Sequence, residues 1–272
     1  MPELPEVETT RRGIAPHCEG LPLQNMVVRN GALRWPVESG LPHWLRGQML
    51  HEVSRRSKYL LMRFDTGTLL VHLGMSGSLR VVDAQALVGK HDHIDLVFGA
   101  DKVLRFNDPR RFGAFVWHEG ADVHAHNLLR HLGPEPLDEA FSADYLWSKA
   151  KRRSVPLKSF IMDAKVVVGV GNIYANEALF KAGLHPLKPA DKLSRPKAQR
   201  LVTEIKAVLA KSIKQGGTTL RDFVGGDGKP GYFAQQLNVY GRGELPCVVC
   251  CKPLTEKRLQ NRTTVFCTQC QK

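Results

Sequence analysis

The stretch YLLMRFDTGTLLVHL, residues 59–73, consists of two short apolar runs separated by Asp65 and Gly67. Short runs rich in Val, Leu and Phe and bounded by turn residues are typical of β-strands. The same pattern of short apolar runs recurs before and after this stretch in MVVRN, SLRVV, HIDLVF, VLRFND and GAFVWH, which makes seven such runs between about residues 26 and 118. This half of the chain is therefore predicted to form an antiparallel β-sandwich or barrel.

Helical patterns flank the strand-rich half. Residues 3–18 are predicted to form a helix, because Pro5 falls in its first turn and the acidic side chains there suit the positive end of the helix dipole. Two prolines and several acids occur in LGPEPLDEAF, residues 132–141, where the short strand-like runs end and longer helical patterns begin. We interpret this stretch as a linker. Helical spacing then dominates as far as Lys214, and a glycine-rich segment, residues 216–231, follows and is expected to be mobile. Short strands are expected around the cysteines beyond it.

The composition is that of a soluble globular protein. Apolar residues make up 43% and charged residues 24% of the 272 residues, which is enough chain for one large or two ordinary domains. No run of about 18 apolar residues occurs, and residues 1–20 lack the basic-then-apolar order of a signal peptide. We therefore expect a cytoplasmic protein with no membrane partner.

Positive charge is concentrated in the second half of the chain. Residues 151–272 carry 22 Lys and Arg against 8 Asp and Glu, whereas residues 1–150 carry 17 against 18. A basic half joined to a neutral half favours a nucleic acid as the partner. The alternatives are a solvated surface with surplus lysines and an anionic membrane surface, although no basic amphipathic helix stands out.

Four cysteines near the C-terminus have the spacing of a metal site. Cys247, Cys250, Cys267 and Cys270 form a C-x2-C-x16-C-x2-C pattern, in which four thiolates can close a tetrahedron around Zn²⁺ on a β-hairpin. Such a site has no open position, so one structural Zn²⁺ is predicted. Disulfides are the alternative, but they are rare in the cytoplasm. Cys251 is expected to be a bystander, and the motif by itself supports only a DNA- or RNA-binding finger.

The first residues offer a nucleophile. If Met1 is removed, the chain begins with the secondary amine of Pro2, and a free α-amino group with a pKa of about 8 is partly neutral at physiological pH. A lysine, with a pKa of about 10.4, would need strong desolvation to match it. Glu3 is then a candidate proton shuttle, and a helix directly behind would hold both groups in place. The alternative is that Pro2 only starts a helix and Glu3 only complements its dipole.

A series of motifs resembles one family along nearly the whole chain. They are MPELPEVET at 1–9, SKYLL at 57–61, HLGMSGSLR at 72–80, KHDHIDLV at 90–97, DPRRFGAF at 108–115, LGPEPL at 132–137, VGVGNIYANEALF at 168–180, QGGTTLRDF at 215–223, DGKPGYFAQ at 227–235 and the four cysteines. In this order they are similar to formamidopyrimidine-DNA glycosylase, the bacterial repair enzyme for oxidised purines. The related endonuclease VIII branch, which prefers oxidised pyrimidines, shares the Pro-Glu start but is less similar just after it.

The resemblance implies a mechanism without an organic cofactor. It implies that the amine of Pro2 attacks C1′ of the damaged nucleotide, that Glu3 protonates the ring oxygen, and that the resulting Schiff base drives β- and then δ-elimination. Lys58 matches the family's catalytic lysine, near the lesion and its phosphate. Arg262 matches a residue assigned to the later elimination and to phosphate contact, and its permanently protonated guanidinium favours the phosphate clamp.

The resemblance also implies how DNA is held. A base inside a duplex must be flipped out before it can react, and this leaves an empty space in the duplex. Met75, Arg110 and Phe112 match the residues that fill this space in the family. The other implied DNA contacts are His91, Arg111, Arg153 and Asn172. Residues 215–231 resemble a loop that closes over the oxidised base, although a bare linker would look the same. Two alternatives are a metal site at His91 and His93, which lacks a third ligand, and a dinucleotide-type glycine loop at VGVGN, which lacks a strand–helix–strand unit.

Together, the resemblance implies an α+β fold of two domains. A catalytic N-terminal β-sandwich with flanking helices is expected at 1–131, a linker at 132–146, a helical domain with a helix–two-turns–helix element at 147–232, and a β-hairpin zinc finger at 233–272. The implied protein is a monomeric DNA glycosylase and AP lyase that acts on 8-oxoguanine and formamidopyrimidines, preferably opposite cytosine, in double-stranded DNA with oxidised bases or abasic sites. The alternatives are an endonuclease VIII-like glycosylase for oxidised pyrimidines and a non-enzymatic zinc-finger DNA binder.

Overall fold

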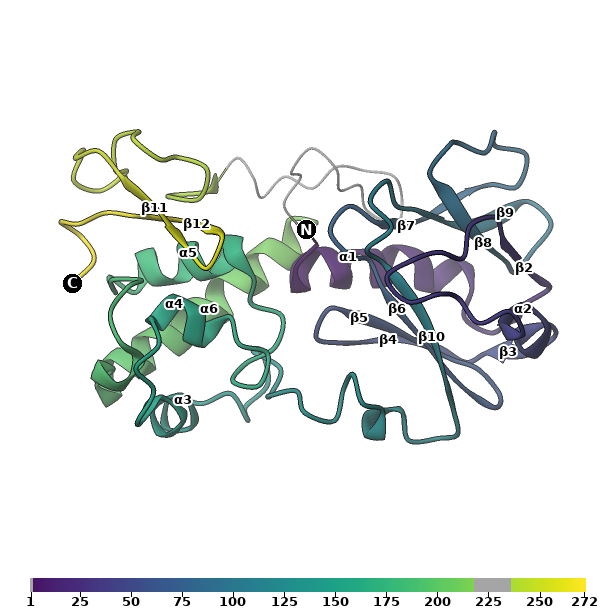
Figure 1. Cartoon of the computed structure of the whole chain (residues 1–272), viewed down its shortest axis with the longest axis horizontal. Coiled ribbons are helices and arrows are strands. Elements are labelled where there is room, and N and C mark those ends of the chain that lie inside the picture. Colours follow the sequence, from purple (N-terminus) through teal and green to yellow (C-terminus); the bar gives the residue numbers. More distant parts are fainter. Residues whose placement is uncertain (1, 218–235) are drawn as a thin grey trace. The chain divides into compact units, whose positions relative to one another are not determined.

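The computed structural model describes residues 2–217 and 236–272 (Figure 1). The chain divides into two compact units, which we call unit 1 (Met1–Arg130 with Gln215–Ala234) and unit 2 (His131–Lys214 with Gln235–Lys272). Nearly all of the glycine-rich segment that was predicted to close over a base lies outside the described residues. Within the described ranges, no helix has the length and apolar character needed to cross a membrane.

Unit 1 contains two four-stranded antiparallel sheets around one core. The first sheet has the order β2 (Asn25–Val28), β8 (Asp92–Val97), β9 (Lys102–Asn107) and β7 (Ser78–Asp83), and the second has the order β10 (Ala114–Glu119), β6 (Gly67–His72), β5 (Tyr59–Arg63) and β4 (Glu52–Arg56). Alternate residues of β5, Leu60 and Met62, are buried in the same core as Ile94, Leu96 and Phe106 of the first sheet. All seven apolar runs are strands, and the β-sandwich prediction is confirmed.

Three strands were missed because they carry no apolar run. β4 has the sequence EVSRR, lies at the edge of its sheet and buries only Val53 completely. Charged side chains of this kind protect sheet edges from unwanted pairing. β1 (Leu21–Pro22) and β3 (Met49–Leu50) are two residues long and pair with each other, and α2 (Leu41–Leu45) is a single short helix.

Helix α1 (Leu4–Ile14), extended by the 3-10 turn η1 (Ala15–His17), packs against β7 and β4. Glu3 is its N-cap residue, and Pro5 occupies the second helical position, where a missing N–H group leaves no hydrogen bond unmade. The Glu6 carboxylate accepts a hydrogen bond from the Glu3 N–H group at 2.8 Å and so completes a capping box. The helix predicted for residues 3–18 is thus present, with 3-10 geometry in its last turn.

Unit 2 contains four α-helices and one hairpin in its described part. The helices are α3 (Ala143–Ala150), α4 (Leu157–Ile161), α5 (Asn172–Lys181) and α6 (Arg195–Lys214), and the hairpin consists of β11 (Thr255–Leu259) and β12 (Arg262–Phe266). The described residues also contain the 3-10 turns η2 (Val123–Ala125), in unit 1, and η3 (Ala190–Lys192), in unit 2. α3 begins inside the stretch predicted as a linker, because the Ser142 hydroxyl caps it by accepting a hydrogen bond from the Tyr145 N–H group at 3.1 Å.

Candidate active site and nucleic-acid interface

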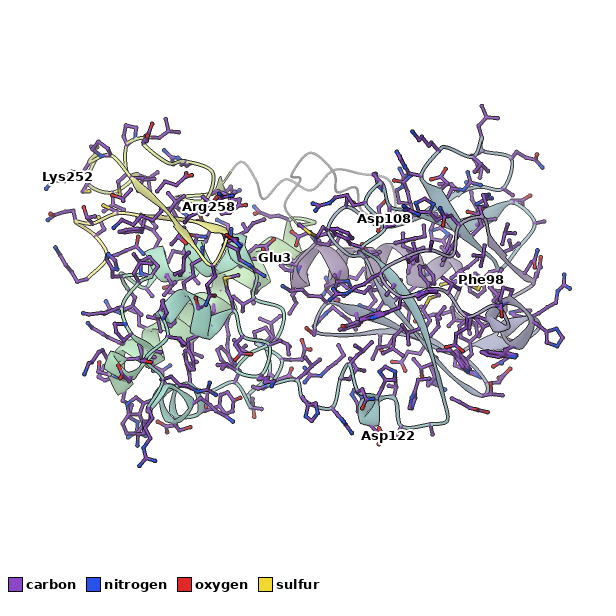
Figure 2. The ribbon with its side chains drawn as sticks, in the orientation of Figure 1. Glu3, Phe98, Asp108, Asp122, Lys252 and Arg258 are labelled. Atoms are coloured by element: carbon purple, nitrogen blue, oxygen red, sulfur yellow. The ribbon has the colours of Figure 1, made fainter. Side chains whose placement is uncertain are left out.

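The N-terminal residues are held in a fixed place. Pro2 is buried, Glu3 is only 2% exposed, and Leu4 directly behind them is fully buried in unit 1. The capping box fixes the backbone of Glu3, whose side chain lies at the head of α1 (Figure 2). The start of the chain is therefore ordered by packing and by hydrogen bonds, as the predicted nucleophile requires.

A carboxylate on α1 connects this helix to β4. Glu8 accepts hydrogen bonds from Arg11 and Arg12 of its own helix and, at 3.3 Å, from Arg55 of β4. Burial by itself would raise the pKa of Glu8, but the hydrogen bonds from the two helical arginines, with the charges of Arg11 and Arg55, outweigh burial and hold this pKa below its ordinary value. Glu8 is therefore ionised at neutral pH and fixes the helix that carries Pro2.

Lys58 occupies a two-residue hairpin turn between β4 and β5. Arg56 and Tyr59 are paired across the hairpin, and Ser57, with φ of 58°, has the left-handed conformation that such turns require. Arg55 donates a hydrogen bond to the Ser57 carbonyl oxygen at 2.8 Å, which stabilises this turn. The structure thus places Lys58 at the tip of a hairpin with a fixed backbone.

His72, at the end of β6, is a site residue that sequence reasoning missed. Burial first, and then the positive charges of Lys58 and Arg34, lower the pKa of His72 to about 4, so the ring is neutral at physiological pH. Its Nδ1 accepts a hydrogen bond from the Gly74 N–H group at 2.9 Å, and the neutral ring therefore carries its proton on Nε2. A neutral donor beside two cations suits an anionic ligand such as a phosphate.

Asp108 ties together two loops, residues 73–77 and 108–113, which we call the paired loops (Figure 2). Its carboxylate is completely buried and accepts hydrogen bonds from the Ser76 hydroxyl at 2.7 Å, the Gly113 N–H group at 2.8 Å and the Arg110 N–H group at 3.3 Å. Gly74 makes the close approach of the loops feasible: its φ is +69°, and a Cβ atom there would lie 2.5 Å from the Gly113 nitrogen.

The paired loops bring the predicted gap-filling residues to one place. Met75 is 40% and Phe112 is 43% exposed, although both are large apolar side chains. The Arg110 guanidinium carbon lies 4.7 Å from the centroid of the Phe112 ring. All three residues line a cavity of about 650 Å³, together with His72 and Arg34. The sequence analysis did not identify Arg34 as a site residue, because Arg34 lies in a loop about 40 residues before Met75 in the chain.

Arg111 also lines this cavity, and His91 contacts the paired loops through its backbone. The His91 carbonyl oxygen accepts a hydrogen bond from the Asp108 N–H group at 3.0 Å, and Arg111 is exposed with φ of 56°. The buried His93 ring uses Nε2 to contact the Asp108 carbonyl oxygen at 2.9 Å. His93 therefore supports the loop backbone, and in the part of the chain that the structure describes, the cysteines form the one cluster with metal-binding geometry.

Unit 2 contributes three predicted contacts. Arg153 is exposed in the connection after α3, and Asn172 is the first residue of α5, where the free N–H groups of a helix can bind an anion. Arg262 is exposed at the start of β12, next to a two-residue turn in which Gln260 and Asn261 both have positive φ. The DNA contacts expected of these three residues stay predictions.

The cysteine cluster has the dimensions of a four-sulfur metal site. The four sulfur atoms lie within 4.8 Å of one another, with Cys247 and Cys270 at 3.9 Å and Cys250 and Cys267 at 3.4 Å. A tetrahedral Zn²⁺ site with Zn–S bonds of about 2.3 Å requires sulfur atoms about 3.8 Å apart. The residues therefore fit a structural metal ion. Cys251 is exposed and is not a member of the cluster.

Comparison with known proteins identifies the family. The model of the formamidopyrimidine-DNA glycosylase N-terminal domain matches residues 1–115, and that of the formamidopyrimidine-DNA glycosylase H2TH domain matches residues 132–224. The chain belongs to the formamidopyrimidine-DNA glycosylase family. The family member from Teredinibacter turnerae is 62% identical over 272 residues, which cover 100% of both chains.

Solved structures of the family are similar over the full length. A variant of the Lactococcus lactis protein in complex with a Fapy-dG containing DNA has 31% sequence identity and a TM-score of 0.93, with 100% of both chains covered. The wild-type protein of the same organism, in complex with an oxidized pyrimidine containing DNA, has 31% identity and a TM-score of 0.92, again with 100% of both chains covered. The two-domain α+β fold predicted from the sequence is therefore confirmed.

Proposed function

We propose that this protein is a bifunctional DNA glycosylase and AP lyase that removes oxidised purines, 8-oxoguanine and formamidopyrimidines, from duplex DNA. Membership of the formamidopyrimidine-DNA glycosylase family supports the glycosylase activity and the substrate class. The observation that carries the mechanism is the head of α1, where Pro2 and Glu3 are both buried and the capping box holds them. A helix start alone would also use Glu3 as the N-cap and Glu6 in the capping box, so the borohydride test below separates that alternative from the proposed nucleophile.

The proposed reaction begins with the deprotonated Pro2 nitrogen. It forms a bond to C1′ as the bond from C1′ to the base breaks, and the base leaves with a proton. Glu3 donates a proton to the ring oxygen, so the sugar opens and an iminium ion remains. Because this ion acidifies the adjacent carbon, loss of a proton there expels the phosphate on the 3′ side, and a second elimination expels the phosphate on the 5′ side. Hydrolysis then returns the free amine.

Residues near the paired loops would hold the DNA for this reaction. Lys58 and the neutral His72 are proposed to contact the phosphate next to the lesion, because the charge of Lys58 acts on the His72 ring, whose Nε2 carries a proton to donate. Met75, Arg110 and Phe112 would fill the gap that the flipped nucleotide leaves. The proposed contacts to the rest of the duplex are His91, Arg111, Arg153, Asn172 and Arg262.

The cysteine cluster is proposed to bind one structural Zn²⁺. Four thiolates fill the coordination sphere, so the ion would supply rigidity to the hairpin that carries Arg262 and would not act in the chemistry. We further propose that the protein works as a monomer in the cytoplasm, where a bacterial chromosome lies.

A second candidate function is excision of oxidised pyrimidines. The Lactococcus lactis relative was crystallised with an oxidized pyrimidine containing DNA, so this lesion class is a realistic substrate for the family. Excision rates on two matched duplexes, one with 8-oxoguanine and one with thymine glycol, separate the two proposals. A strong preference for thymine glycol would contradict the purine assignment.

Borohydride trapping tests the mechanism itself. Sodium borohydride reduces a Schiff base to a stable amine, so the wild-type protein should become covalently attached to DNA with an abasic site. Pro2→Gly should reduce the trapping rate by at least about 100-fold, whereas Pro16→Ala, which changes an exposed proline of η1, should not. Mass spectrometry of the purified chain must show loss of Met1. Undiminished trapping by the Pro2 variant would exclude the proposed nucleophile, and a protein that is never trapped would be a DNA binder without lyase activity.

A further inference from the structure

Lys158 is a buried cation in unit 2. It lies in α4, is only 1% exposed, and its Nζ donates hydrogen bonds to the Thr263 carbonyl oxygen and to the Thr264 hydroxyl, both at 2.8 Å. Removing an ammonium group from water is costly unless hydrogen bonds replace its hydration. Lys158 is therefore a specific connection between α4 and β12, and it is unlike the solvated lysines that dominate the charge of this half of the chain.

The connection continues to Arg262. The Thr264 hydroxyl, which accepts a hydrogen bond from Lys158, in turn donates one to the Arg262 carbonyl oxygen at 3.4 Å. Lys158 and Arg262 also line the same pocket of about 220 Å³. The lysine thus supports the backbone from which Arg262 projects, while its own side chain is occupied inside the protein.

Asn176 makes a matching connection from α5. Its Oδ1 accepts a hydrogen bond from the Val265 N–H group at 2.8 Å, and its Nδ2 donates one to the Asn172 carbonyl oxygen at 2.6 Å. Asn176 is 1% exposed, and Asn172 is the first residue of α5. One buried amide therefore links the strand that carries Arg262 to the helix end that can bind an anion.

We propose that Lys158 and Asn176 are positioning residues for DNA cleavage. They hold Arg262 in a fixed position relative to the N-terminus of α5, so that Arg262 and this helix end can bind phosphates of the same duplex. The two residues act on successive parts of β12, Lys158 at Thr263 and Thr264 and Asn176 at Val265. Neither of them touches DNA in this proposal. The inference rests on the proposed function, in which Arg262 binds phosphate and supports elimination.

The test uses the full-length, zinc-loaded protein and a duplex with one preformed abasic site. Lys158→Met removes both hydrogen bonds but keeps the length of the side chain, and Thr264→Val removes the middle link without a change of shape. Asn176→Ala breaks the second connection. Lys192→Met, which removes an exposed lysine of η3, is the control with the same loss of charge. Strand cleavage, the initial rate of borohydride trapping and zinc content are measured at saturating protein.

We expect Lys158→Met and Asn176→Ala to slow strand cleavage about 10- to 100-fold, because a misplacement of about 1 Å can cost about 100-fold in rate. Thr264→Val should slow it less, and Lys192→Met should not change it. Trapping should change less than about 3-fold in every variant, because Pro2 and not the finger forms the Schiff base. When Lys158→Met is added to Arg262→Ala, cleavage should not slow further, since the lysine acts through the arginine.

Three results would overturn this inference: fully additive effects of the Lys158 and Arg262 substitutions, equal losses of trapping and cleavage, or cleavage that is unchanged by Arg262→Ala. If Lys158→Met fails to fold or loses its zinc, Thr264→Val combined with Arg262→Ala provides the same comparison. A wild-type protein that is never trapped, or a Pro2→Gly variant that is trapped normally, would instead disprove the proposed function. The two failures are therefore distinguishable.

Discussion

Replacing Asp108 by Asn tests whether the paired loops depend on a single carboxylate. One of its oxygens accepts from Gly113, and the other accepts from Ser76 and Arg110. An asparagine has only one acceptor oxygen, so either the Gly113 N–H group or the Arg110 N–H group loses its hydrogen bond to this side chain, and Arg110 then keeps only its bond of 3.3 Å to the Ser76 hydroxyl. Hydrogen bonds to a charged group contribute about 1.5–3 kcal/mol and neutral ones about 0.5–1.5 kcal/mol, so the substitution should lower the free energy of unfolding by about 2 kcal/mol. Asp108→Ala, which removes all three acceptor contacts, should lower it by about 4 kcal/mol.

The consequence for function follows from where the loops place their side chains. Loosened loops would no longer hold Met75 and Phe112 in the lining of the cavity, so affinity for a duplex with an abasic-site analogue should fall by about 10-fold, which corresponds to about 1.4 kcal/mol of binding free energy. Affinity for undamaged duplex should change less, because it depends mainly on phosphate contacts. Urea unfolding and fluorescence anisotropy measure the two effects.

Asp122→Asn is the matched control. Asp122 caps η2 by accepting one hydrogen bond from the His124 N–H group at 3.1 Å, and asparagine is an equally good cap (Figure 2). Its substitution should change the free energy of unfolding by less than about 0.5 kcal/mol. If Asp108→Asn matched the control in both urea midpoint and lesion affinity, the reasoning on the paired loops would be refuted.

Three further predictions can be checked with the same assays. Burial, then the charges of Lys58 and Arg34, set the pKa of His72 at about 4, below the ordinary value of 6.5. Between these two values the unfolded state therefore binds more protons than the folded state. The contribution of His72 to the free energy of unfolding should be fully present above about pH 6.5 and should fall by about 3 kcal/mol as the pH drops toward 4. His72→Gln should flatten this pH dependence in urea titrations, and an unchanged slope would contradict the assignment. Gly74→Ala should cost about 2 kcal/mol or more and weaken lesion binding, because its Cβ would meet backbone atoms at 2.5 Å; a stable variant with normal binding would show that the loops can separate freely. Metal removal by a chelator should abolish DNA binding and free four additional thiols for titration, whereas Cys251→Ser should leave metal content unchanged.

The sequence alone determined seven of the eight strands of the sandwich and the four-cysteine cluster. Apolar runs such as those of β5 and β6 bury themselves whatever their partners are, because burial of apolar surface dominates folding. Cys247 and Cys250 are separated by two residues, and this spacing by itself allows their two sulfur atoms to bind the same metal ion. β4 was missed for the converse reason: its charged residues suit a sheet edge, and an edge strand depends on its neighbour and not on its own burial.

Only the tertiary structure decided which polar groups meet. Asp108 and Ser76 are 32 residues apart in the chain, and Lys158 and Thr264 are 106 apart, yet each pair is hydrogen-bonded. Nothing in the local pattern around Lys158 distinguishes it from the solvated lysines near it. Hydrogen bonds and pKa shifts arise from distance and burial, which exist only after the two sheets and the helices have packed. The sequence therefore determines which chemical groups are present, and the packing of the chain decides which of them act together.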